Sequence, residues 1–413
     1  MFYKITIVIL IFVTNTSCRT SSSQKYKAQS INTLTEEGDA FENCDSVDPL
    51  RSLCTKILET SQLSHNFNIP PQTSSVFLEI SSNKGIRSSP SSFQDIDSLT
   101  SPGGLIIYDN DLSYLENINP RSLDDTAALF TMLIPNHERP AAETNKKLTQ
   151  SNLAGNWTFN SIGEPAPDSV KVRYRIREHF QKAKLQLKIF LTGANRNSRQ
   201  MPEIWDLMNI SSPSSASKEN FKIFSNELER IFCQANIDLD IIEVKDIEIP
   251  DGLGYPEGFR YVSLVPQIDK ASLKELMTAV LDQSKSEDGI LHLTLIDGFV
   301  FSDGWIGWSW SPGPYESETL LSGMIVAMGD ESPISIASVA AHEIGHFLGL
   351  YHVKELGEDL PDPLEDTDSN NSDNLMYPSN HGTSFSVGQI DIMKRHPNII
   401  PVAENDSSFN CGP

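Results

Sequence analysis

The feature that most constrains the fold is a short run of histidines. His342 and His346 stand four residues apart, and His352 follows six residues later, just beyond Gly349. Apolar residues recur around them at three- and four-residue spacing, which predicts a helix with one buried stripe of Ile336, Ala340, Ile344, Phe347 and Tyr351. On such a helix the first two imidazoles lie one turn apart and can converge. Gly349 lacks a Cβ, so the chain can turn sharply there and bring His352 back toward them.

This arrangement is a metal-binding pattern. Two imidazoles one helical turn apart can hold a zinc ion at about 2.0–2.1 Å. A third histidine leaves the fourth tetrahedral position open for water, which is the catalytic arrangement rather than the structural one. Glu343 follows the first histidine and can reach such a water as a general base. The residues therefore predict metal ligands at His342, His346 and His352, with one catalytic zinc ion as the expected cofactor.

The pattern HExxHxxGxxH in residues 342–352 resembles that of the metzincin zinc endopeptidases. A second stretch, Asn374–Pro378, resembles the Met-turn of that clan, in the form found in matrix-metalloprotease-like members. The resemblance covers residues 185–400. It implies that Met376 forms a hydrophobic floor under the metal, and that Tyr377 and Pro378 begin the wall of a substrate pocket. It also implies a sheet whose edge strand, at 323–328, pairs with an extended substrate.

The resemblance implies a secreted or lipid-anchored zinc metalloendopeptidase. Peptide bonds would be hydrolysed by zinc-activated water with Glu343 as general base, and the partner would be a protein or peptide substrate. The alternative is a non-catalytic, zinc-containing surface-binding lipoprotein; the presence of Glu343 favours the enzyme, because loss of that base is the usual mark of inactivity. The subfamily stays open, since Val353 stands where the best-known subfamilies have a signature residue. Residues 362–367 are more similar to bacterial lipoprotein metzincins and to pappalysin-like proteins.

The charge balance excludes some classes of partner. The 413 residues contain 55 acidic and 32 basic side chains, a formal net charge of −23. Binding to nucleic acid needs clustered Lys and Arg, and so does docking of a basic patch on anionic lipid. We therefore expect no nucleic-acid partner, and a protein that acts as a monomer.

The N-terminus reads as an export signal. One basic residue, Lys4, precedes an apolar run at 5–13 that has the length of a signal-peptide core and is too short to span a bilayer. The segment 1–18 ends at Cys18 after Thr16 and Ser17, which resembles a bacterial lipoprotein signal, although Asn15 departs from that pattern. Cleavage near Thr16 and plain secretion are the alternative. The expected location is the cell envelope or the exterior, with membrane attachment only through a lipid on Cys18.

Four further cysteines suit an oxidising compartment. They are Cys44, Cys54, Cys233 and Cys411, and they allow three pairings into two disulfides. In one of these pairings Cys44 and Cys54 close a short loop, and Cys233 ties a helix to the C-terminal tail at Cys411.

The texture of the sequence predicts an α/β (α+β) chain in two folded parts. Residues 19–65 are polar and indicate a tether or pro-segment. Residues 66–180 contain short strands separated by turn residues, typical of a β-sandwich-like accessory domain; in this range Val170, Val172 and Tyr174 alternate with polar residues, which predicts a half-buried strand. Residues 183–413 alternate strands with amphipathic helices and form the expected metzincin-like catalytic domain, with a twisted mixed sheet and an active-site helix.

Two further stretches allow two interpretations each. The aromatic run 304–310 either packs under a loop or forms an apolar wall of a binding cleft. The segment 355–373 carries eight acids and no Lys or Arg, so it is either a solvated acidic surface or a Ca²⁺ site without EF-hand spacing. The other histidines show no ligand spacing and are expected to be ordinary: His65, His137, His179, His292, His381 and His396.

Overall fold

The structure is a computed structural model of the chain. The expected signal segment with Cys18, and residues 19–43 of the expected tether, lie outside the described residues. The structure describes residues 44–58, 63–81, 95–111, 122–124, 129–136, 148–149, 153–162, 169–176, 180–192, 219–247, 261–263, 270–284, 287–296, 298–300, 306–316, 322–328, 331–354, 362, 364–378 and 382–411.

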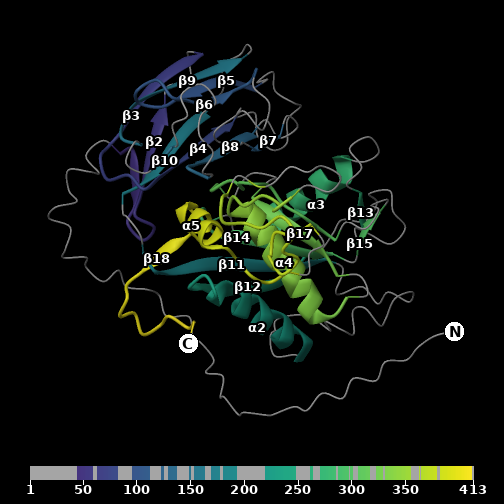
Figure 1. Cartoon of the computed structure of the whole chain (residues 1–413). Coiled ribbons are helices and arrows are strands. Elements are labelled where there is room, and N and C mark those ends of the chain that lie inside the picture. Colours follow the sequence, from purple (N-terminus) through teal and green to yellow (C-terminus); the bar gives the residue numbers. More distant parts are fainter. Residues whose placement is uncertain are drawn as a thin grey trace. The chain divides into compact units, whose positions relative to one another are not determined.

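The N-terminal described residues form two antiparallel sheets (Figure 1). The six-stranded sheet has the order β1 (Ser46–Asp48), β2 (Leu53–Leu58), β10 (Ser169–Arg175), β4 (Ser75–Ser81), β8 (Leu129–Ile134) and β7 (Ser122–Asp124). The four-stranded sheet has the order β3 (Ser64–Ile69), β9 (Gly155–Ile162), β5 (Asp95–Thr100) and β6 (Ile106–Asp109). Strands β1 and β2, and the start of β3, lie in the range 19–65 where the sequence predicted a tether. The polar composition hid them because β1 has only three residues and only alternate side chains of β3 are buried.

Both sheets contribute side chains to one apolar core. Its largest side chains are aromatic, among them Phe130 and Tyr174 from the six-stranded sheet and Trp157 and Phe159 from the four-stranded sheet. The indole N–H of Trp157 donates to the carbonyl of Leu153 at 2.7 Å, which satisfies the one polar atom of this buried ring. The core thus joins strands that are far apart in the sequence.

A third sheet, which contains both parallel and antiparallel strand pairs, begins at residue 182. Its order is β12 (Ile237–Ile247), β11 (Lys182–Thr192), β14 (Leu291–Ile296), β17 (Gly323–Ala327) and β16 (Gly307–Trp308), and β18 (Ile400–Val402) pairs with β11. A small parallel pair joins β13 (Tyr261–Ser263) and β15 (Gly298–Val300). Strands β12, β11, β14 and β17 run parallel, while β16 is antiparallel to β17. Parallel strands need crossover connections, and a helix lies in two of them, between β11 and β12 and between β12 and β14.

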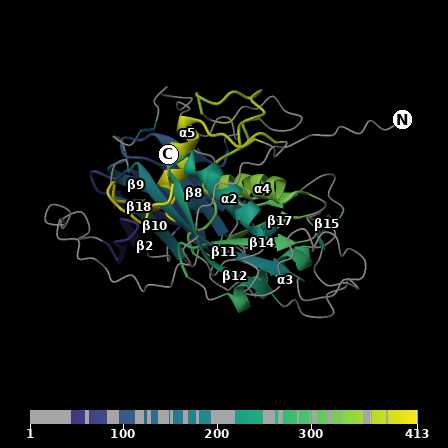
Figure 2. The same cartoon turned by 90° about the horizontal axis from the view of Figure 1, so that it is seen from below.

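Helices cover both faces of this sheet (Figure 2). Helices α2 (Glu219–Cys233) and α4 (Pro333–Phe347) pack on one face through a large apolar core, and α3 (Lys270–Gln283) packs on the other through Leu276, Met277 and Val280. The short α5 (Val387–Arg395) begins with a capping box between Ser386 and Gln389. This confirms the expected mixture of helices and strands.

The sheet differs from expectation at its edge. The sequence placed the edge at 323–328, but β17 lies between β14 and β16, and all five of its residues are buried. The strand that ends the sheet, within the described residues, is β16. A strand of two residues gives too short a periodicity to be found from the sequence.

Strand β10 also differs from expectation, because both of its faces are buried. Val170, Val172 and Tyr174 enter the core between the two antiparallel sheets, as their alternation predicted. The intervening Arg173 and Arg175 are buried as well, only 3% and 1% exposed. On their face of the six-stranded sheet, Leu53, Phe77 and Leu133 join the core that contains α4, and all of these residues belong to the compact unit Ala40–Pro413. The alternation therefore predicted correctly which side chains of β10 share a face, but not that the face with Arg173 and Arg175 is also buried.

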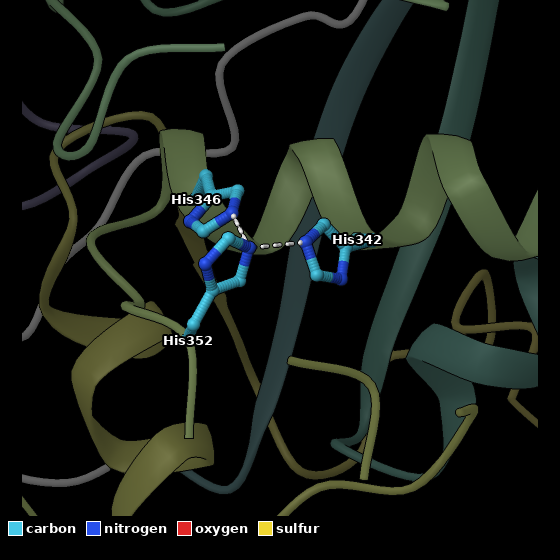
Figure 3. A group of neighbouring side chains, drawn as sticks. All are labelled: His342, His346 and His352. Carbon is cyan, nitrogen blue, oxygen red and sulfur yellow. Dashed lines mark hydrogen bonds between the residues drawn. The ribbon is translucent and has the colours of Figure 1, made fainter. Parts of the chain in front are cut away.

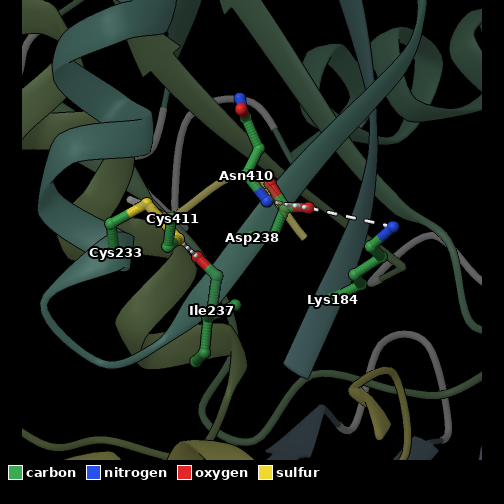
Figure 4. The surroundings of a disulfide bond; sticks show 6 residues. All are labelled: Lys184, Cys233, Ile237, Asp238, Asn410 and Cys411. Atoms are coloured by element: carbon green, nitrogen blue, oxygen red, sulfur yellow. Dashed lines mark hydrogen bonds and ion pairs between the residues drawn. A yellow bond between two sulfur atoms is a disulfide. The ribbon is translucent and has the colours of Figure 1, made fainter. Parts of the chain in front are cut away.

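Two disulfides are present. Cys44, just before β1, is bonded to Cys54 in β2, and Cys233 at the end of α2 is bonded to Cys411 (Figure 4). This confirms one of the three pairings that the sequence allowed. Beside the second disulfide, the backbone N–H of Asn410 donates to Asp238, which also lies 3.9 Å from Lys184. Among the described residues, no helix is both long and apolar enough to cross a membrane.

Candidate metal centre

Helix α4 carries two of the three histidines and ends where the sequence predicted. Its N-terminus is capped by the Ser332 hydroxyl, which accepts a hydrogen bond from the Ser335 amide, and Pro333 occupies its first turn. The helix ends at Phe347, and Gly349 adopts a φ of +101° that side-chain-bearing residues avoid. The turn at this glycine brings His352 back to the helix.

The three imidazoles meet at one point (Figure 3). The Nε2 atom of His352 lies 3.1 Å from the Nε2 atoms of both His342 and His346. Within the described residues, these three form the single group of histidine, cysteine or acidic side chains arranged to hold a metal ion. Two nitrogens that each lie about 2.05 Å from a tetrahedral zinc ion are about 3.3 Å apart, so the spacing fits such an ion.

Backbone carbonyls fix the protonation of two of the rings. The Nδ1 atom of His342 lies 2.6 Å from the carbonyl oxygen of Leu375, and that of His346 lies 2.8 Å from the carbonyl oxygen of Leu350. A carbonyl can only accept, so each Nδ1 carries the proton and each Nε2 presents its lone pair. Lone pairs that face one another repel unless a cation lies between them. The donor set therefore suits a metal ion.

Burial keeps these rings neutral. It lowers the pKa of His342 to about 3 and the pKa of His346 well below its ordinary value, and the neighbouring histidines lower both further. Neutral imidazole is the form that binds metals, so the environment prepares the ligands.

Glu343 is buried directly beside the first histidine. Burial raises the pKa of its carboxyl group to about 8, against an opposing effect of the Ser309 hydroxyl. The carboxylate packs against Gly307 of β16 so closely that a Cβ at that position would overlap it. The Glu343 carboxyl group can therefore hold or release a proton near neutral pH, and its close contact with Gly307 restricts its position.

The predicted Met-turn residues lie under and beside this cluster. Met376 is fully buried, and its Sδ would lie 2.7 Å from a Cβ at Gly345, between the two histidines of α4. Tyr377 is partly exposed, with the Lys354 ammonium 4.8 Å from its ring centre, and Pro378 is partly exposed as well. The Asn374 side chain anchors the turn by accepting from the Met376 amide at 2.9 Å.

The remaining histidines and acids have other surroundings. His65, His292 and His396 are buried away from the cluster, whereas His137, His179 and His381 lie outside the described residues. Of the acidic segment, Glu355, Glu358 and Asp359 lie outside the described residues. Asp366 accepts from the Ser386 hydroxyl and the Gly388 amide at the start of α5, and Asp362 accepts from Leu364 and Thr367. These contacts explain two of the acids by local structure.

Sequence reasoning left the aromatic run 304–310 open between packing under a loop and forming a wall of a binding cleft, and did not assign residues 311–316 to the site. Trp308 and Trp310 of the aromatic run form an edge-to-face pair at 5.7 Å, and Ser309 between them donates to the carbonyl of Glu343 at 2.9 Å. Trp305 lies outside the described residues. The signal was the close spacing of Gly, Trp and Ser in this stretch, but nothing in the sequence tied it to α4.

Comparisons with known proteins give little beyond the geometry. No protein-family model matches the chain, and no curated protein matches it in sequence. A chain of a chaperone–substrate complex overlaps with 53% of this chain and 34% of its own length, at 15% identity and a TM-score of 0.30. Metalloproteinase-II from Bacteroides fragilis overlaps with 55% of this chain and 62% of its own, at 16% identity and a TM-score of 0.32. The chain thus spans less than two thirds of either structure, and at these TM-scores the likeness carries no argument.

Proposed function

We propose that the protein is a zinc-dependent metalloendopeptidase of the metzincin type. The observation that carries the proposal is the convergence of the Nε2 atoms of His342, His346 and His352 beside the buried carboxyl group of Glu343. Three neutral nitrogen ligands favour zinc and leave one position free. A bound zinc ion would supply Lewis-acid activation of water and polarisation of the scissile carbonyl.

The chain's own residues have distinct roles in this proposal. Glu343 takes a proton from the attacking water and returns one to the leaving amine, and a pKa raised by burial suits it to hold that proton in between. The carbonyls of Leu375 and Leu350 hold two of the rings in the orientation that directs Nε2 inward. Met376 fills the space beneath the ligands without offering a charge.

The substrate side of the proposal centres on β16 and on Tyr377. Strand β16 ends the sheet within the described residues and lies against Glu343, so an extended peptide that pairs with it would pass the metal centre. Tyr377 and Pro378 are partly exposed and would form one wall of a pocket. We therefore propose β16, rather than the expected strand at 323–328, as the strand that pairs with substrate.

The same proposal includes export of the protein from the cytoplasm. A signal at 1–18 directs the chain to the cell envelope or the exterior, and the two disulfides suit such a compartment. A lipid on Cys18 would be the sole membrane attachment. If so, the mature protein partitions into detergent and Cys18→Ser releases it; an unmodified N-terminus near Ser17 in mass spectrometry would contradict lipidation.

The deciding experiment compares the wild type with Glu343→Gln. We expect about one zinc ion per chain in both, cleavage of casein or a quenched-fluorescence peptide by the wild type alone, and inhibition by a chelator. The variant should lose activity by several orders of magnitude, because the substitution removes only the base. Near-normal turnover in the variant would refute the role of Glu343. Stoichiometric zinc without cleavage by the wild type would favour the non-catalytic lipoprotein instead.

A further inference from the structure

Residues 306–316 cross the end of α4 that carries the candidate base. At its start, this segment touches the Glu343 carboxylate through Gly307. Three hydrogen bonds then fasten it to the helix and the turn beyond it: from Ser309 Oγ to the Glu343 carbonyl at 2.9 Å, from the Gly313 amide to the Phe347 carbonyl at 2.8 Å, and from Ser311 Oγ to the Leu350 carbonyl at 2.8 Å. The segment therefore forms a wall along the site.

The opposite side of the same segment is held by the six-stranded sheet. The Thr131 hydroxyl of β8 donates to the Pro312 carbonyl at 2.6 Å, and the Tyr315 amide donates to Glu79 of β4 at 3.3 Å. Glu316, which ends the segment, forms ion pairs with Lys171 and Arg173 of β10. Three adjacent strands of one sheet thus grip one segment of the α/β part.

Arg173 is the centre of this grip. Its guanidinium lies 2.7 Å from Glu79 on its own sheet and 2.8 Å from Glu316 on the segment, and it stands 4.7 Å above the ring centre of Tyr315. The planar guanidinium can satisfy two carboxylates at once, which an ammonium group cannot do with the same geometry. Removal of this one group takes away the Glu316 ion pair with Arg173 and leaves the segment held by Thr131, Glu79 and Lys171.

The polar side chains that hold the segment form a row across three neighbouring strands. Lys171, Glu79 and Thr131 stand opposite one another in the registers of β10, β4 and β8. A charged row buried between two layers is tolerated only when every member finds its partner. The row accepts the segment in one position, whereas an apolar surface would tolerate sliding.

We propose that the six-stranded sheet is a working part of the catalytic unit, with Arg173 as a positioning residue. Through Glu79 and Glu316 it holds residues 306–316 against α4, and so fixes the wall that touches the Glu343 carboxylate. This rests on the proposed peptidase function for its kinetic consequence. The mechanical consequence, that the segment is held by Arg173, does not depend on any activity.

The test uses the full chain with Arg173→Met, and Arg230→Met as a matched control. Arg230 also forms an ion pair, with Glu227 at 2.7 Å on α2, but it makes no recorded contact with the segment. Hydrogen–deuterium exchange is followed in peptides that cover 306–316 and, separately, β11. We expect roughly tenfold faster exchange in 306–316 for Arg173→Met with β11 unchanged, because exchange follows local opening. The control should leave both regions unchanged.

Kinetics and metal content complete the test. With a peptide substrate, Arg173→Met should keep about one zinc ion per chain, lose roughly tenfold or more in kcat and raise KM, because the displaced segment carries both the wall beside Glu343 and the proposed substrate strand β16. Arg173→Lys, which keeps the charge but not the fork, should give an intermediate kcat. If Arg173→Met fails to fold, Thr131→Val removes a single hydroxyl from the same grip and should accelerate exchange in 306–316 selectively.

Two results would overturn the proposal. Exchange in 306–316 that is unchanged, or that rises equally in every segment, would show that Arg173 serves only general stability. A kcat that falls only with the folded fraction would show the same. If the wild type cleaves no peptide, the proposed function fails, and the exchange experiment alone still decides whether Arg173 holds the segment.

Discussion

The protein has two buried polar clusters, and they are built in opposite ways. The histidine cluster brings three Nε2 atoms to one point, and the Nδ1 contacts of His342 and His346 leave two of these atoms with lone pairs, an arrangement suited to a cation. The ion cluster of Glu79, Lys171, Arg173 and Glu316 contains two formal charges of each sign, and each charge has an ion-pair partner within the chain. Burial raises the pKa of Glu79, while the adjacent Arg173 and Lys171 outweigh burial at Glu316 and hold its pKa low. The histidine cluster therefore indicates a binding site for a cation. The ion cluster, whose charges pair with one another, indicates a contact that holds two parts of the chain together.

The largest expected effect concerns the histidine cluster. His346→Ala leaves two nitrogen ligands, so we expect the zinc of the wild type, about one ion per chain, to be lost on dialysis. Metal analysis by mass spectrometry measures it. His65→Ala, a buried histidine on β3 outside the cluster, is the control and should keep its metal. Stoichiometric zinc in His346→Ala would show that this nitrogen is not a ligand, and the contrast between the clusters would disappear.

The ion cluster should fail in a different way. Arg173→Met leaves two carboxylates buried without their shared partner, so we expect the free energy of unfolding to fall by about 3–5 kcal/mol. Equilibrium denaturation in urea measures this loss. Arg230→Met, on an exposed pair, should cost less than about 1 kcal/mol. Equal small losses for both arginines would mean that the ion cluster contributes no more than a surface pair.

His292 is a buried histidine outside the cluster, so it shows the effect of burial on an imidazole that is not a predicted metal ligand. Both ring nitrogens of His292 are buried without a hydrogen-bond partner, and burial together with the charge of Lys188 lowers its pKa from 6.5 to about 4. The folded state thus holds this ring neutral, while the unfolded chain takes up a proton below pH 6.5. Stability is therefore fully present above that pH and falls as the pH drops from 6.5 to 4, by up to about 3 kcal/mol from this residue.

Denaturation curves at pH 7 and pH 4.5 test this sign. His292→Leu should lose less stability between the two pH values than the wild type, because it has no proton to gain. It should bind zinc normally, unlike a variant of the cluster. A variant as acid-sensitive as the wild type would assign the acid sensitivity to other groups, such as His396, whose pKa burial lowers to about 3.

The Met-turn should tolerate change, because its methionine fills space beside the histidine cluster without completing it. Met376→Leu nearly conserves volume, so we expect a loss of less than about 1.5 kcal/mol in stability and an unchanged zinc content. Thermal unfolding and metal analysis measure the two quantities. Loss of zinc in this variant would give the sulfur a role that packing does not explain.

The smallest effect is expected in the acidic segment. Asp366 accepts from the Gly388 amide in the first turn of α5, so Asp366→Ala should cost about 1 kcal/mol whether or not a cation is present. We expect Ca²⁺ to shift the melting temperature equally, or not at all, in the wild type and in the variant with both Asp366→Ala and Asp368→Ala. A shift in the wild type alone would show a Ca²⁺ site there, and a second ligand-dependent cluster.

The sequence by itself determined the histidine cluster. Its three members lie within eleven residues, and helical periodicity together with one glycine places them, so local rules were sufficient. The same holds for the helices α2 and α4, whose apolar spacing is strong. For the two disulfides the sequence left three pairings open, and the structure decided among them.

Only the tertiary structure decided the ion cluster and the place of residues 306–316. Arg173 is 94 residues from Glu79 and 143 from Glu316, and no spacing rule joins such distances. The alternation of β10 showed which side chains share a face, but a polar face is normally solvated, and here it is covered by a segment from elsewhere in the chain. Which strand ends the sheet was likewise settled by β16, a pair of residues too short to leave a period. Local spacing encodes what one element can hold, whereas contacts between elements depend on packing that no short pattern records.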